Sequence, residues 1–348
     1  MRLDTFVRFP VPGPVARSAE PESGRIGSLF LRRRPNPLSV VTTPSDSARS
    51  IRVVLRSSGK VVCVTVFDFA GRPVGLPGSF RLELKLKKVA IGTQQLNVVD
   101  EGAGTVLLLI HGFPLDHSMW RPQIDDLSSD FRVIAPDLRG FGTSSTVEPS
   151  VSMQRLADDL ANLLEALDID DPVSLGGLSM GGYVAWEFWR RHPRRLKHLI
   201  LCDTRAEADD HKTRQTRVAT AKRVLREGSA LLAKMMIPRL FATETLQTGA
   251  PAVDATRQVI LRTHPATIAA ALHGMANRRD TSTWLPDIDI PTLLLCGASD
   301  VITPAREMQR LAAALPSSHY VTIPHAGHLA PLENPVAVNQ EIRRFLDR

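Results

Sequence analysis

The chain has 348 residues, of which 43% are apolar and 23% charged, and this composition suits a globular protein with a sizeable core. No apolar run approaches the roughly 18 residues that a membrane span needs, and no secretory signal follows the N-terminus. Residues 1–88 hold 16 lysines and arginines against 6 acidic residues, a net charge of +10, whereas the remaining residues hold 27 against 30, a net charge of −3. The larger part therefore offers no broad nucleic-acid-binding surface.

The first 84 residues are predicted to be a basic, largely disordered extension, because Pro, Arg and Ser dominate and apolar runs are few. An isolated hairpin is possible within residues 51–75, where apolar residues alternate between turn signals. Three interpretations stay open: a transit-like or basic tethering segment, a small accessory element, or a start site chosen too far upstream, which we favour.

From residue 85 onward the pattern becomes regular and predicts one domain over residues 85–348. Short apolar runs predict strands in LELKLKKVAIGTQQLNVVDEG, TVLLLIHG, FRVIAPDLRGFG, PVSLGGLS, LKHLILCD, PTLLLCGASD and HYVTIPHAGH. Helices are predicted over residues 152–167, where the leucines share one face, and at YVAWEFWRRHP, AREMQRLAAAL and NPVAVNQEIRRFL. This alternation predicts an α/β fold with a doubly wound, mostly parallel sheet. Residues 206–285 hold no strand-like run, and they predict a helical lid inserted between two late strands.

The segment GGLSMGG places glycines two residues before and two residues after Ser179. It fits the G-x-S-x-G pattern, in which a strand turns sharply into a helix and exposes a strained nucleophilic serine. Glycine suits both flanking positions because side chains there would collide at so tight a bend. An apolar strand before the pattern and an amphipathic helix after it favour this interpretation over an ordinary glycine-rich turn.

A nucleophilic serine needs a base and a group that orients the base. His328 lies in the loop between the last strand and the last helix and is preferred to His325, which is predicted to be structural or exposed. Asp300 follows the strand before that loop, and Asp203, which also ends a strand, is its competitor. The chain order Ser179, Asp300, His328 is the order expected of α/β-hydrolases.

An oxyanion hole is predicted from backbone N–H groups. The motif HGFP ends a central strand, so the amide of Phe113 and the amide of Met180 are expected to point at one place. The loop APDLRGFGTSS, with Asp137, is predicted to be structural because its glycine spacing does not fit a dinucleotide-binding loop. Cys63, Cys202 and Cys296 are scattered in apolar runs, which predicts reduced, buried thiols in a cytoplasmic protein and no metal site.

From about residue 87 the chain resembles the α/β-hydrolase superfamily through HGFP, DLRGFGTS, GLSMGG, GASDVITP and AGHLAPLENP. Within it, the chain is most similar to 3-oxoadipate enol-lactonase and cofactor-free haloperoxidase/esterase-type hydrolases. Epoxide hydrolases and haloalkane dehalogenases differ, because they carry aspartate where this chain has Ser179. The resemblance implies Ser179 as nucleophile, Asp300 as acid, His328 as base, and Phe113 and Met180 as oxyanion donors.

The expected activity is hydrolysis of a small carboxylic ester or lactone through an acyl-enzyme, with no cofactor and no nucleic-acid partner. A perhydrolase, an acyltransferase, a C–C bond hydrolase and a non-catalytic ligand-binding protein on the same fold remain alternatives. A possible apolar pocket for the acyl or ring group is formed by Met235, Met236, Leu240 and Phe241. The natural substrate and the oligomeric state are not predicted.

Overall fold

The computed structural model describes residues 28–31, 38–41, 66–67, 73–74, 86–145 and 150–347. By their internal contacts the residues divide into two units, Met1–Glu83 and Leu84–Arg348. The predicted disorder of residues 1–84 falls mostly outside the described residues, and it stays a prediction.

Four short strands are described in the first unit. β1 (Ser28–Leu31) pairs antiparallel with β2 (Leu38–Val41). β3 (Val66–Phe67) pairs antiparallel with β4 (Pro73–Val74). This second pair lies within residues 51–75, where the alternating sequence pattern allows a hairpin.

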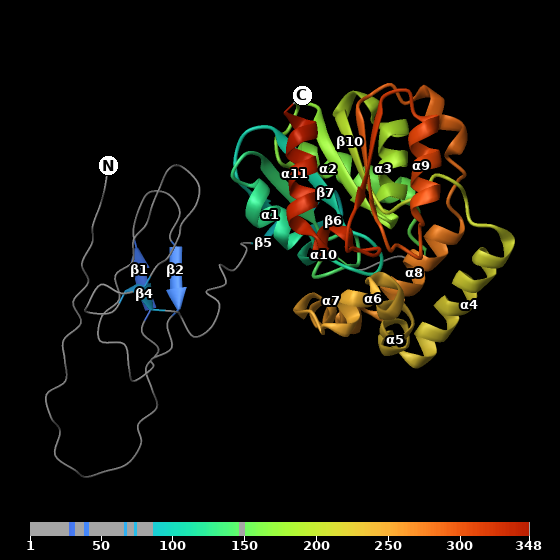
Figure 1. The fold of residues 1–348 in the computed structure, drawn as a ribbon, viewed down its shortest axis with the longest axis horizontal. Coiled ribbons are helices and arrows are strands. Elements are labelled where there is room, and N and C mark those ends of the chain that lie inside the picture. Colours follow the sequence, from blue (N-terminus) through green and yellow to red (C-terminus); the bar gives the residue numbers. More distant parts are fainter. Residues whose placement is uncertain are drawn as a thin grey trace, which may run out of the picture. The chain divides into compact units, whose positions relative to one another are not determined.

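An eight-stranded sheet forms the centre of the second unit (Figure 1). Its order is β12-β11-β10-β9-β7-β8-β6-β5. The strands are β5 (Leu86–Ile91), β6 (Gln94–Glu101), β7 (Val106–Ile110), β8 (Arg132–Pro136), β9 (Val173–Leu178), β10 (Leu196–Cys202), β11 (Thr292–Gly297) and β12 (Ser318–Ile323). β6 is antiparallel to β5 and β8, and the other neighbouring strands are parallel. The predicted α/β fold with a mostly parallel sheet is confirmed. Parallel neighbours end at the same edge, so the segments that follow β7, β9, β10 and β11 are brought together.

Helices flank this sheet. They are α1 (Arg121–Leu127), α2 (Met153–Ala166), α3 (Met180–Arg191), α9 (Ala305–Ala314), α10 (Ala330–Glu333) and α11 (Pro335–Leu346), with the 3-10 helices η1 (His117–Trp120), η2 (Pro193–Arg195) and η3 (Ser282–Asp287). In α2 the side chain of Ser152 accepts a hydrogen bond from the amide of Arg155, which satisfies one of the free N–H groups at the start of the helix. The leucines of α2 are buried on one face, as predicted from their spacing.

Five α-helices lie between β10 and β11, before η3, and we call residues 211–276 the helical insertion. They are α4 (His211–Glu227), α5 (Ser229–Leu240), α6 (Thr243–Gln247), α7 (Pro251–Arg262) and α8 (Pro265–Ala276). α4 packs against α8 and α5 against α7, and the group gathers beside one end of the sheet (Figure 1, yellow to orange). No helix in the described part of the chain is both long and apolar enough to cross a bilayer.

A buried ion pair joins the loop after β8 to α2. Arg139 donates to Asp159 from Nε at 2.8 Å and from Nη2 at 2.6 Å, and both side chains are at most 3% exposed. Replacing Arg139 with methionine leaves the Asp159 carboxylate buried, with Arg155 3.7 Å away. We expect the free energy of unfolding to fall by about 3–5 kcal/mol, measured by urea denaturation.

The matched control is Arg344→Met, because Arg344 pairs with Glu341 but is 60% exposed. An exposed pair contributes only about 0–1 kcal/mol. Equal losses of stability in the two variants would show that the Arg139–Asp159 pair has no special structural role.

Candidate active site

Ser179 lies at the turn between β9 and α3. Its φ of 53° and ψ of −110° are values that residues other than glycine rarely adopt. Its amide donates to the carbonyl oxygen of Cys202 at 2.9 Å, and its carbonyl oxygen accepts from Thr204 Oγ1 at 2.8 Å. These bonds to the segment after β10 hold the serine backbone in its strained conformation. Because α3 begins at Met180, the positive end of its dipole lies at this turn.

The two glycines of the G-x-S-x-G pattern lie in close contact with other backbone atoms. A Cβ atom built on Gly177 would lie 2.5 Å from the carbonyl oxygen of Gly181. A Cβ atom built on Gly181 would lie 2.4 Å from the carbonyl oxygen of Ile110, at the end of β7. Any side chain at either position would therefore displace backbone, which explains why the turn contains glycine there.

Asp300 and His328 form a buried pair at the same edge of the sheet. His328 Nδ1 lies 2.8 Å from Asp300 Oδ2, and their side chains are 3% and 0% exposed. Asp300 Oδ1 accepts the amides of Ile302 and Thr303, and Thr303 Oγ1 donates to Oδ2. Burial raises the pKa of Asp300, but His328 and these hydrogen bonds outweigh burial and the pKa is lowered. Asp300 is thus held as a carboxylate beside the imidazole. Sequence reasoning missed Thr303, although a threonine three residues after the aspartate was a visible signal.

The two rival residues occupy different environments. Asp203 is fully buried, and its Oδ1 accepts the amide of Gly297 at 2.8 Å. Burial and then the adjacent Asp300 raise the pKa of Asp203 well above its ordinary value, which disfavours the charged form of this carboxyl group. His325 is 77% exposed and lies 3.3 Å from Glu244. The structure therefore pairs His328 with Asp300 and not with Asp203.

The expected oxyanion donors lie on the two segments that meet beside Ser179. Phe113 follows β7 and is 8% exposed, and Met180 begins α3 and is fully buried. A Cβ atom built on Gly112 would lie 3.6 Å from the Cβ of Ser179, so the segment after β7 runs directly past the serine. This proximity is what two amides facing a common oxygen require.

His111 connects the loop after β7 to the loop after β8, and this role was not predicted from the sequence. The amide of Leu138, after β8, donates to His111 Nε2 at 3.0 Å. Nδ1 therefore carries the proton and donates to the carbonyl oxygen of Gly112 at 2.9 Å. Burial lowers the pKa of His111, which keeps the ring neutral. The ring thus fixes the backbone just before Phe113. The signal was the histidine of HGFP, but its partner lies 27 residues away.

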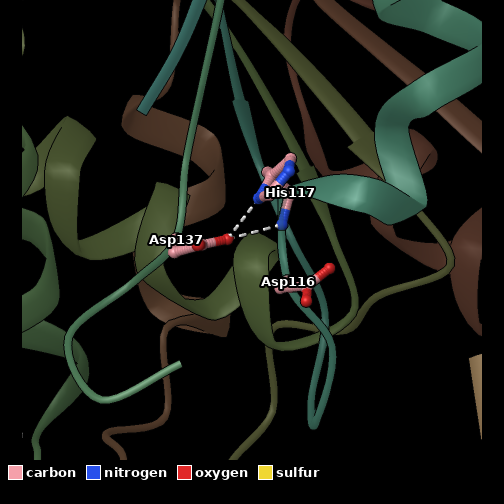
Figure 2. Close-up of side chains that lie close together, drawn as sticks. All are labelled: Asp116, His117 and Asp137. Atoms are coloured by element: carbon pink, nitrogen blue, oxygen red, sulfur yellow. Dashed lines mark hydrogen bonds and ion pairs between the residues drawn. The ribbon is translucent and has the colours of Figure 1, made fainter. Parts of the chain in front are cut away.

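Asp116, His117 and Asp137 form a second cluster of titratable groups (Figure 2). Asp137 Oδ1 accepts from the amide of His117 at 2.9 Å and lies 2.7 Å from His117 Nδ1. Asp116 Oδ2 accepts from Arg262, and its Oδ1 accepts from Ser118. These hydrogen bonds engage the carboxylate oxygens that would otherwise bind a metal ion. The cluster links the loop after β7 to the loop after β8 through hydrogen bonds. This agrees with the structural role predicted for Asp137.

His117 is expected to stabilise the fold more strongly at low pH than at high pH. Burial lowers its pKa, but the hydrogen bond to Asp137 and the charge of that carboxylate outweigh burial, and the pKa is raised. The stabilisation is then complete below the unfolded-state pKa of about 6.5, and it is lost as the pH rises through the folded-state pKa.

We therefore expect His117→Gln to lower the free energy of unfolding more at about pH 5.5 than at about pH 9, measured by urea denaturation at both values. His325→Gln, at an exposed histidine, is the control and should show little change at either pH. A pH-independent loss in His117→Gln would mean that Asp137 does not favour the protonated ring.

One cavity of about 450 Å³ lies among α5, α6 and α7 of the helical insertion. It is lined by Ala230, Ala233, Lys234, Ile237, Pro238, Leu246, Arg257 and Leu261. None of the four residues expected to form an apolar pocket lines it. Leu240 and Phe241 are buried, Met236 is half-buried and Met235 is 40% exposed. The role of these four in substrate binding stays a prediction.

Comparisons with known proteins agree with this fold. The family model for the α/β hydrolase fold matches residues 105–335. A thermophilic esterase from Thermogutta terrifontis is 44% identical, with a TM-score of 0.73 over 76% of this chain and 98% of that one. The enol-lactonase from Burkholderia xenovorans LB400 is 26% identical, with a TM-score of 0.71 over 75% of this chain and all of that one. The 3-oxoadipate enol-lactonase 1 of Acinetobacter baylyi is 28% identical over 220 residues, 63% of this chain and 80% of that protein. The chain thus belongs to the α/β-hydrolase fold family, with esterases and enol-lactonases among its relatives.

Proposed function

We propose that this protein is a serine hydrolase that cleaves a carboxylic ester or lactone through an acyl-enzyme intermediate. The proposal rests on the buried Asp300–His328 pair, with 2.8 Å between its atoms, at the sheet edge that also carries the Ser179 turn. Ser179 is the nucleophile, His328 the general base, and Asp300 the group that orients the base. Esterase and enol-lactonase relatives support this substrate class.

The hydrogen bond to Asp300 fixes which nitrogen of His328 acts as the base. The Nδ1–H group donates a hydrogen bond to Asp300 Oδ2, so Nε2 is the nitrogen with a free lone pair. In the first step Ser179 Oγ forms a bond to the carbonyl carbon while its proton passes to Nε2. Asp300 stabilises the imidazolium that results without itself taking the proton.

The tetrahedral intermediate carries a negative oxygen, which accepts hydrogen bonds from the amides of Phe113 and Met180. When the carbonyl re-forms, the bond to the leaving alkoxide breaks and His328 gives that oxygen the proton. Water then attacks the acyl group on Ser179 with His328 again as base. The acid is released and Ser179 recovers its proton. These steps need no cofactor.

The experiment combines covalent labelling with a choice of acceptors. A fluorophosphonate should label the wild-type protein, and Ser179→Ala should prevent labelling. The rates of turnover of a panel of esters and lactones are then measured with water, a thiol or hydrogen peroxide as the acyl acceptor, and the three rates are compared. Preference for a thiol would indicate an acyltransferase, and preference for peroxide would indicate a perhydrolase. Cleavage of a carbon–carbon bond would indicate a C–C bond hydrolase. An unlabelled, inactive wild-type protein would indicate a ligand-binding protein.

A further inference from the structure

Glu333 is a polar residue of the AGHLAPLENP motif that the proposed mechanism does not use. It ends the short helix α10, five residues after His328. Its two carboxylate oxygens accept hydrogen bonds from two different segments. Oε1 accepts the amide of Gly327 at 2.7 Å. Oε2 accepts the amide of Ala242 at 2.8 Å and Thr245 Oγ1 at 2.6 Å.

These bonds join the histidine loop to the helical insertion. Gly327 immediately precedes His328, whereas Ala242 and Thr245 lie at the junction of α5 and α6. Glu333 therefore bridges segments about 85 residues apart through one side chain. A carboxylate suits this position because it only accepts hydrogen bonds, and all three partners are donors.

The backbone on both sides of His328 also touches the α5–α6 junction. On one side, a Cβ atom built on Gly327 would lie 2.6 Å from the nitrogen of Ala242. On the other side, the amide of Leu329 donates to the carbonyl oxygen of Leu240 at 3.1 Å. His328 is thus flanked by two attachments to the helical insertion, and the half-buried Glu333 side chain reinforces the one at Gly327, beyond the exposed His325–Glu244 pair.

We propose that Glu333 is a positioning residue that fixes the histidine loop against the helical insertion, and so holds His328 where it can act as a base. This inference rests on the proposed function. The base lies on a loop, and loops need such attachments to be rigid. Small errors in the placement of a catalytic group lower the rate of the chemical step. The same contacts make the α5–α6 junction part of the support of the active site.

The test is Glu333→Gln, in which the amide group of glutamine turns one of the acceptors into a donor that faces N–H or O–H groups. The control is Glu244→Gln, because Glu244 is 71% exposed and pairs with His325, which is also exposed. We expect Glu333→Gln to lower kcat for an ester about 10- to 100-fold while KM changes by less than about 3-fold. Hydrogen exchange at the amides of Gly327 and Ala242 should become about 10-fold faster or more. Glu244→Gln should leave kcat and both exchange rates at wild-type values.

A second variant keeps the test decisive if Glu333→Gln does not fold. Thr245→Val removes a single donor to Oε2, and we expect a smaller fall in kcat together with faster exchange at Ala242. Wild-type exchange and kcat in folded Glu333→Gln would overturn the inference, as would exchange that rises equally in Glu244→Gln. A wild-type protein that is neither labelled nor active overturns the proposed function instead, because amide exchange is measured without any substrate.

Discussion

Replacement of Ser179 by alanine is expected to lower kcat/KM for an ester by about 10⁵-fold or more, because it removes the proposed nucleophile. Alanine keeps the Cβ atom and has to adopt the same φ of 53°, so the strain of the turn is unchanged. The folded structure should therefore survive, and the loss should appear as a loss of chemistry. The measurement is the steady-state rate with p-nitrophenyl esters, with urea denaturation to verify folding.

The control is Ser317→Ala, since Ser317 is an exposed serine in the turn before β12. Its activity and its fluorophosphonate labelling should match those of the wild type. Residual activity in Ser179→Ala within about 10-fold of the wild type would mean that another group attacks the substrate.

Asp300→Asn is expected to lower kcat by about 10⁴-fold, the size of effect seen when the orienting carboxylate of a triad is lost. Asparagine places an N–H group or a neutral oxygen opposite His328 Nδ1, where the carboxylate oxygen now lies at 2.8 Å. The imidazole is then no longer held with Nε2 free to accept a proton. The same substrate and the same denaturation measurement apply.

Asp203→Asn is the matched comparison, because Asp203 belongs to the same buried cluster as Asp300 and His328. Its raised pKa favours the neutral carboxyl group, and asparagine is a neutral side chain of similar shape that still accepts the amide of Gly297. We expect kcat to stay within about 10-fold of the wild type. A larger loss in Asp203→Asn than in Asp300→Asn would reverse the two assignments.

The alternation of strands and helices could be read from the sequence because each element buries one continuous apolar run or stripe. β7 is almost completely buried, and its uninterrupted apolar run VLLLI shows it. Helix α1 was not predicted, since only seven residues form it and it holds two aspartates and a proline. Its place depends on contact with α11, at the other end of the domain, which no local pattern reveals.

In the candidate site too, contacts between residues distant in the chain could not be predicted from local sequence patterns. The sequence favours Asp300 but leaves Asp203 as a competitor, because both follow buried strands. Pairing of β10 with β11 sets them side by side, and only then do their pKa values separate. Bonds such as those of His111 and Glu333 join residues distant in the chain, so they follow from strand order and helix placement and not from spacing.

The helical insertion enters and leaves between two strands that pair directly with each other. The backbone register of β10 and β11 is therefore maintained by their own ladder, with Cys202 opposite Leu295. We therefore expect that the helical insertion can be exchanged for the corresponding segment of a relative without disruption of the sheet. A chimera of this kind has to retain residues 240–245, because hydrogen bonds join these residues to the loop of His328 and to the short helix that follows it.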